Sequence, residues 1–471
     1  MARLGVFSVA LLCVCLAGHA EDARDLSSLT FWPQPLSAPV LPLGAREAAS
    51  SPTTAARDGR GELGRHEDAP QPQSREELTA AVAAQLDAIE AEQARNGDRS
   101  PELIGALSSL AFTYQQLGEH ASAEAALQHA IEIARINFGL HSLDQADAVE
   151  SLVSSRETRG DYGGAAENRR YLRELVGRNF HDPRVVGILT EMARQEMDNA
   201  RRLVGVPAPG VIAITSGGGD GWMTPPTPSL AALHAAQSDY IAAIQAAVRT
   251  HTGNTADVFA LEDALTDTVY FELANPEILG PGHRRSAWNS NAGAPPWYPT
   301  IGFIGAQVLR HKALDSMSFR RSPVDVAKDL IALADWYLVF GSFQAGSMTK
   351  SYGPALDTYR TARDLLVNSE LSPEAIDELL SPEVPPAVPV LPDNIVGTVH
   401  DRVLRGYIDV SIDITRFGDV KRMEVIARSP AATKDVEEQL KRYVGERTFR
   451  PRFVNGELAR SDRFAARFYF D

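Results

Sequence analysis

The hydrophobic positions along the chain follow two different periods. From about Arg75 to Leu366 they recur at three- and four-residue spacing, the period of amphipathic helices that pack on one another. Beyond residue 395 the period becomes two, because Ile408, Val410 and Ile412 alternate with polar residues. Between them, residues 381–394 have the proline density of an extended linker. We therefore predict a helical body at 75–380 and a small second domain at 395–471.

The helical part contains an internal repeat. The order of large, small and turn-forming residues around Gly118 recurs around Gly160, so the turn glycines are 42 residues apart. A third copy spans 326–366 and carries an insertion at 343–351, expected to be a loop. Two further helices are expected at 229–250 and 258–273, next to loops rich in glycine and proline at 207–229 and 275–300.

This spacing resembles the tetratricopeptide repeat (TPR), particularly its longer kinesin-light-chain variety. Residues 106–134 match that pattern well, whereas the second copy departs from it at Arg156 and Arg169. The resemblance implies an all-α, TPR-like solenoid that binds peptide or protein through the first helix of each repeat. The alternative is that this face is only solvated. The groove residues expected on this face are Phe112, Gln115, Gln116, Glu150, Ser154 and Glu157.

The C-terminal part has the order strand, strand, helix, strand. A turn at residues 416–419 follows the first strand, and Val436, Leu440 and Val444 give the helix one apolar face. After the helix, Phe449 is expected to fill the core, Pro451 to end strand pairing, and residues 455–456 (Asn-Gly) to form a tight turn. In the last strand, one face carries Phe464, Ala466, Phe468 and Phe470, and the other carries Arg463, Ala465, Arg467 and Tyr469.

This β-β-α-β order resembles the C-terminal domain of TonB-family energy transducers, over residues 404–470. In that family the domain lies in the periplasm and binds a segment of an outer-membrane transporter, which adds as a strand beside the final strand. The resemblance places that edge at residues 459–470. The alternative is that a linker or a dimer partner covers the edge. The partner-binding residues that this implies are Arg463, Phe464, Ala465, Arg467 and Tyr469.

The first twenty residues have the features of a secretory signal peptide: Arg3, an apolar run from Leu4 to Leu16, and a small-residue site at Ala20. Cleavage there would leave the protein in the periplasm without either cysteine, and so without disulfides. The alternative is a retained anchor, although the run is short for a spanning helix. Residues 21–74 have no sustained period and are expected to be a flexible segment.

The net charge and the spacing of potential catalytic residues argue against several classes of function. The chain carries a net charge of −15, which argues against nucleic acid as a partner. The histidines are scattered without metal-ligand spacing, and SGGGDGW at 216–222 lacks the lysine of a phosphate loop. We therefore expect no catalytic residues, no metal and no cofactor.

The sequence thus favours a non-catalytic interaction or scaffold protein of a bacterial cell envelope. Its partners would be proteins or peptides, among them an outer-membrane transporter or an envelope complex. Association with a membrane would occur only through partners or a retained N-terminal segment. The alternative is a TonB-type energy transducer that acts on outer-membrane transporters. A hydrolase with its site in the loops at 207–229 or 275–300 is a third hypothesis.

Overall fold

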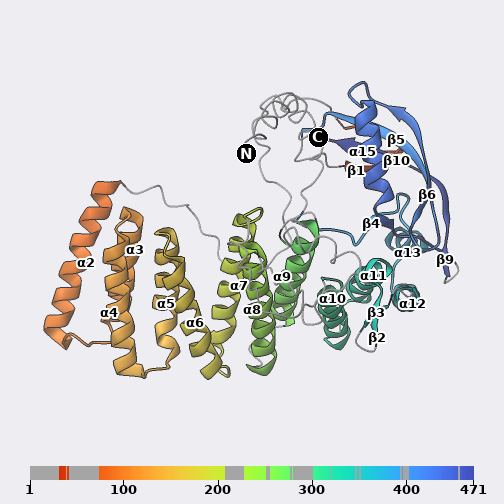
Figure 1. Cartoon of the computed structure of the whole chain (residues 1–471). Coiled ribbons are helices and arrows are strands. Elements are labelled where there is room, and N and C mark those ends of the chain that lie inside the picture. Colours follow the sequence, from red (N-terminus) through yellow and green to blue (C-terminus); the bar gives the residue numbers. More distant parts are fainter. Residues whose placement is uncertain are drawn as a thin grey trace, which may run out of the picture. The chain divides into compact units, whose positions relative to one another are not determined.

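The computed structural model describes most of the chain, as helices in its body and strands gathered in its C-terminal part (Figure 1). The described residues are 31–38, 40–41, 74–206, 227–250, 255–275, 278, 301–319, 321–344, 347–349, 352–392, 395, 403–454 and 457–471. The chain divides into two compact units. The helical unit comprises Thr53–Asn199 and His234–Leu261, and the mixed unit comprises Met1–Pro52, Ala200–Leu233 and Glu262–Asp471.

The helical unit is built from antiparallel hairpins, in which α3 packs on α4 and α5 on α6. Gly118 and Gly160, the turn residues of the 42-residue repeat, both have a positive φ that favours glycine. The expected hairpins are therefore confirmed. The helices that contribute to this unit are α2 (Arg75–Asn96), α3 (Leu103–Leu117), α4 (His120–Phe138), η1 (Leu143–Gln145), α5 (Ala146–Thr158), α6 (Tyr162–Arg178) and parts of α7 (Arg184–Arg202), α8 (Pro228–Thr250) and α9 (Thr255–Ala274).

The second repeat tolerates its arginines because each lies beside buried acids. Arg156 Nε is 3.5 Å from the carboxylate of Glu124, and Arg169 pairs with Glu157 and, at 3.3 Å, with Glu196. A charged side chain is accepted between packed helices when its partner is present. Departures from the repeat pattern at these positions are thus compensated by acids on neighbouring helices.

The described helices of the mixed unit that precede its main sheet strands in the chain include α10 (Ile301–Ser318), α11 (Pro323–Phe340), α12 (Gly353–Val367) and α13 (Pro373–Leu380). The pair α11 and α12 forms the expected third hairpin. One detail differs from expectation: the insertion holds two short paired strands, β2 (Ser342–Gln344) and β3 (Ser347–Thr349). The last helix before the Pro-rich segment, α13, starts at Ser372 and Pro373 and ends at Leu380, the predicted end of the helical body.

The strands of the mixed unit form a four-stranded sheet in the order β1-β10-β5-β6, with antiparallel neighbours. Its expected strands are confirmed as β5 (Gly406–Ile414), β6 (Val420–Arg428) and β10 (Ser461–Phe470), and the helix as α15 (Lys434–Gly445). The apolar face of α15 packs on the sheet and forms one core with Phe449. Other short strands are β4 (Ala387–Val388), β7 (Thr448–Phe449), β8 (Arg452–Val454) and β9 (Glu457–Ala459).

Part of the N-terminal segment is ordered, contrary to the prediction of a flexible segment. Within residues 21–74, expected to be flexible, Phe31–Pro35 form β1 and pair with β10. Several other expectations fall outside the described residues: the signal peptide at 1–20, most of the loops at 207–229 and 275–300, and the turn at 455–456, which β8 and β9 flank.

The Pro-rich segment 381–394 also differs from the expected linker between two domains. Its strand β4 pairs with β7, and Val388 lies in an apolar cluster with α11, α12 and α13. Phe453, which follows α15 in the sequence, belongs to the same cluster. The C-terminal sheet and the last helices therefore belong to one compact unit.

A buried ion pair joins these two parts of the mixed unit. Arg450, after β7, reaches Asp335 on α11, with Nε 2.9 Å from Oδ1 and Nη2 bonded to Oδ2. The hydroxyl of Tyr359 on α12 donates to the same carboxylate, and Arg450 Nη1 donates to the Leu379 carbonyl at 3.0 Å. Asp335 is only 1% exposed, so every partner of its carboxylate is a protein group.

Candidate functional site

The face formed by α3, α5 and the helical-unit part of α7 is the candidate binding surface of the helical unit, and we call it the helix-A face. Side-chain hydrogen bonds align these helices: Gln115 Nε2 donates to the Ser151 carbonyl at 3.1 Å, and Gln195 Nε2 donates to Glu150 at 2.9 Å. These bonds join α3 to α5 and α5 to α7. Positions one turn away from them therefore share one continuous surface.

The six groove residues predicted from the sequence divide into two groups on this face. Phe112, Gln116 and Ser154 are exposed, and Phe112 is the most accessible aromatic of the three helices at 61%. The other three, Gln115, Glu150 and Glu157, are half-buried and hydrogen-bonded within the unit. The first group is available to a partner, whereas the second mainly holds the helices in place.

Glu150 is the most perturbed group of the helix-A face. Burial raises the pKa of its carboxyl to about 7, and the nearby charges of Glu191 and Asp147 act in the same direction, against the hydrogen bond from Gln195. The carboxylates of Glu150, Glu191 and Asp147 lie near the guanidinium of Arg194, which forms an ion pair with Glu191. The helix-A face therefore carries a surplus of carboxylates on α5 and α7, and an exposed phenylalanine on α3.

A network of ion pairs to two buried acids links α6, α7 and α8, and sequence reasoning did not predict it. Arg173 makes two hydrogen bonds to Asp239 on α8, at 3.1 and 2.8 Å, and a further ion pair with Glu196 at 3.5 Å. Asp239 is 3% exposed. Asp239 and Glu196 could have indicated this network, because each is an acid at a buried helix position where an apolar residue is expected.

The residues predicted for strand addition on β10 are mostly engaged in the sheet itself. Arg467 forms a bidentate pair with Asp409 at 2.7 and 2.9 Å, and Tyr469 is fully buried, with its hydroxyl accepting from the Leu41 amide at 2.8 Å. Phe464 packs on the core and Ala465 is half-buried. Arg463 has an exposed side chain at a β-bulge, where its φ is +53° and its amide donates to Asp413.

The edge of β10 that the sequence analysis expected to accept a peptide carries β1 in this structure (Figure 1). The edge is thus covered, but by the chain's own N-terminal segment and not by the linker or dimer partner that the alternative named. The opposite edge of the sheet is formed by β6.

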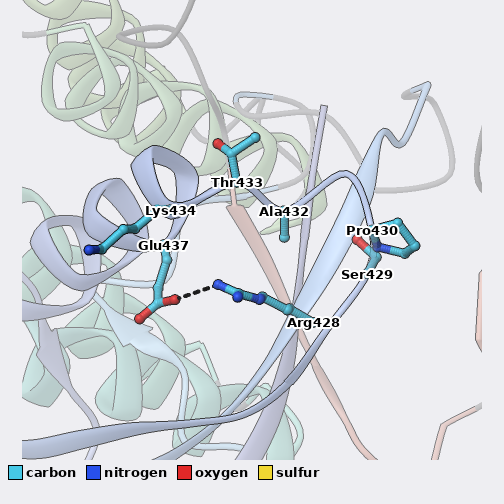
Figure 2. A pocket seen from close by; sticks show the side chains of 7 residues that line it. All are labelled: Arg428, Ser429, Pro430, Ala432, Thr433, Lys434 and Glu437. Atoms are coloured by element: carbon cyan, nitrogen blue, oxygen red, sulfur yellow. Dashed lines mark hydrogen bonds and ion pairs between the residues drawn. The ribbon is translucent and has the colours of Figure 1, made fainter.

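A shallow pocket of about 620 Å³ lies where β6 leads into α15 (Figure 2). Arg428 and Glu437 face each other across it at 3.1 Å, Ser429 Oγ accepts from the Tyr407 amide, and Thr433 caps α15. These polar groups serve the fold locally. In the described residues, no group of three or more histidine, cysteine or acidic side chains is placed to hold a metal ion, and no helix has the length and apolarity needed to span a membrane.

Comparisons with known proteins place few limits on the function. No family model matches the chain, and no curated protein matches it. Among solved structures, the chain is similar to one described as the crystal structure of BtubC (BKLC) from P. vanneervenii, with 14% identity and a TM-score of 0.32. That match covers 64% of this chain and 95% of the other.

Proposed function

We propose that the protein is a non-catalytic interaction scaffold of the bacterial cell envelope, located in the periplasm, whose TPR-like helical unit binds an extended segment of a partner protein on the helix-A face. The observation that carries the proposal is the exposed Phe112 on a face that also carries a surplus of carboxylates. A segment with basic and apolar side chains would complement both features. The helical hairpins supply a rigid frame for such recognition, and no chemical step is required.

The surplus of negative charge predicts how binding depends on pH. A cationic side chain of the partner is attracted to ionised Glu150, whose pKa of about 7 leaves it largely protonated at pH 6. We therefore expect a basic, apolar peptide to bind more tightly at pH 8 than at pH 6. Substitution of Glu150 by glutamine should remove most of that difference.

The test uses the full-length protein and a labelled twelve-residue peptide of alternating lysine and leucine, with fluorescence anisotropy as the readout. Binding should be lost or weakened at least about tenfold in Phe112→Ala, a loss of the size expected for an interface anchor. The matched control is Phe138→Ala, because Phe138 is also half-exposed but lies at the end of α4. Equal binding by both variants and the native protein, or equal binding of a glutamate-leucine peptide, would refute the helix-A face as the site.

The second candidate function is an energy transducer acting on outer-membrane transporters. The order β5, β6, α15, β10 favours it. It would need residues 4–18 to be retained as an anchor and the β10 edge to be free for a transporter segment, and that edge is paired with β1. The mass of the mature N-terminus separates the two candidates, because a chain that starts at Glu21 lacks the anchor.

A further inference from the structure

Two carboxyl groups face each other where α9 meets α10 in the mixed unit. Glu262 on α9 is 4% exposed, and no donor among the described residues bonds to its Oε2 atom. The carboxyl of Asp315 on α10 lies close enough to form a hydrogen bond with that of Glu262. Two carboxylates are both acceptors, so this bond forms only when one of them carries a proton. We call these two residues the carboxyl pair.

The same junction contains two further acids, which lie against neighbouring bases. Lys312 Nζ on α10 lies 2.6 Å from Asp263 on α9 and 3.4 Å from Asp329 on α11. Arg321, which follows α10, lies 3.5 Å from Asp329, and the Ser316 hydroxyl donates to Asp329 at 2.5 Å. These contacts connect α10 to α11 through Asp329 and to α9 through Asp263. The carboxyl pair is therefore a second polar contact between α9 and α10.

These surroundings keep Glu262 protonated. Burial raises the pKa of its carboxyl from an ordinary value of 4.5 to about 9, and the hydrogen bond and charge of Asp315 act in the same direction. The charge of Asp329 also raises this pKa, whereas Lys312 lowers it by less than burial raises it. A further titratable group, His311, has an exposed ring 3.8 Å from Asp315. The closed junction thus holds a proton that a solvated Glu262 would lose.

We propose that the carboxyl pair is a pH-sensitive switch, which holds α9 against α10 while it shares a proton and lets the two helices separate when the proton is lost. Separation exposes Glu262 to solvent, where it ionises. A fall in pH therefore tightens the junction, and a rise in pH loosens it. The packing of α9 is in this way coupled to the pH of the surrounding solvent. All residues of the switch lie in the mixed unit, so it is independent of the helix-A face.

The direction and size of the effect follow from proton linkage. Between about pH 4.5 and pH 9 the closed junction binds one proton more than the open junction. Each unit of pH then changes the equilibrium between the two by up to about tenfold in favour of opening as the pH rises. From pH 6 to pH 8 we expect opening to increase by at least about tenfold. The increase should be confined to this junction, because opening is a local event.

The experiment measures amide hydrogen exchange of the full-length protein at pH 6 and pH 8, with each rate divided by its intrinsic value at that pH. Amides of α9 after Glu262 and of α10 should lose at least about tenfold of their protection at pH 8. In Glu262→Gln this loss should disappear, because the neutral amide still donates to Asp315 and does not titrate. His311→Gln should keep the native dependence on pH. The matched control for the change from carboxyl to amide is Asp364→Asn, an acid on α12 whose side chain is 70% exposed, and it should also keep that dependence.

A second measurement detects the proton itself. Infrared spectroscopy of the native protein at pH 8 should show the carbonyl band of a protonated carboxylic acid, which Glu262→Gln should lack. Glu150 does not interfere, because its pKa of about 7 leaves it largely ionised at pH 8. The native protein is informative here even if the variant does not fold.

Three results would overturn the proposal. Equal corrected protection of α9 and α10 at pH 6 and pH 8 would show that the junction does not respond to pH. An unchanged pH dependence in Glu262→Gln, or its loss in His311→Gln, would assign the response to another group. Absence of the carboxylic acid band in the native protein at pH 8 would show that the carboxyl pair holds no proton.

Discussion

Replacement of Asp335 by alanine tests whether the C-terminal sheet and the last helices unfold as one body. Asp335 on α11 accepts two hydrogen bonds from Arg450 and one from Tyr359, and all three residues are buried. The substitution leaves the guanidinium of Arg450 buried without its counter-charge, because the Leu379 carbonyl and the Tyr359 hydroxyl beside it are neutral.

The loss of one member of a buried ion pair typically costs about 3–5 kcal/mol of unfolding free energy. For a unit of this size, each kcal/mol corresponds to a fall in Tm of roughly 2–4 °C, so the expected fall is roughly 6–20 °C. A double variant, Asp335→Leu with Arg450→Met, removes both charges and keeps the volume. It should recover most of the loss, since uncharged pairs of similar shape are often as stable as buried ion pairs.

The assay is urea unfolding followed by circular dichroism, together with amide hydrogen exchange resolved along the chain. In Asp335→Ala, amides of α11 and of β5 should lose protection together. The matched control is Asp357→Ala, an exposed acid on α12 paired with Arg360, which should change the unfolding free energy by less than about 1 kcal/mol.

One result would refute this reasoning. If α11 and α12 lose protection while β5 and α15 retain it, the sheet is a separate domain and residues 381–394 act as the linker that the proline pattern suggested. A double-mutant cycle between positions 335 and 450 with a coupling energy below about 0.5 kcal/mol would also contradict a direct interaction.

Three further predictions concern stability. Gly305→Ala should destabilise the mixed unit by about 1–3 kcal/mol in urea unfolding, because the new Cβ would lie 2.0 Å from the indole of Trp336. Ser74→Ala should lower the Tm slightly through a loss of about 1 kcal/mol, since it removes the capping box that Ser74 forms with Glu77 at the start of α2. In Glu150→Gln, the unfolding free energy should depend less on pH between 5 and 8. The native pKa of about 7 lies above the unfolded value, so the stabilisation is fully present at low pH and is lost as the pH rises through 7, which urea unfolding at pH 5, 6.5 and 8 would reveal.

Local patterns predicted the parts of the fold that depend on short-range order. The alternation from Ile408 to Ile414 located β5, and the four-residue spacing of Val436, Leu440 and Val444 located α15. Each of these elements buries one face against a core, so the spacing of its own apolar residues is enough to predict it. The recurrence of Gly118 at Gly160 likewise marked two hairpin turns.

The parts that sequence reasoning missed depend on partners far away in the chain. Asp335 looks like an irregularity in an apolar helix until Arg450 is placed beside it. Strand β1 has two prolines and no alternation, and its identity as a strand comes from its pairing with β10 and from the contacts of Phe31 with Tyr443 and Phe470. Interactions of this kind leave no periodic signal, because each half is informative only when the other is known.

The pairing of β1 with β10 has a consequence for how the protein is made. Phe31 emerges from the ribosome early, whereas Phe470 emerges close to the end of translation. At roughly 5–20 residues per second, the interval between them is on the order of 20–90 s. Throughout that interval the aromatic ring of Phe31 has no native partner, so the nascent chain exposes an aromatic residue that chaperones can hold until the last strand is made.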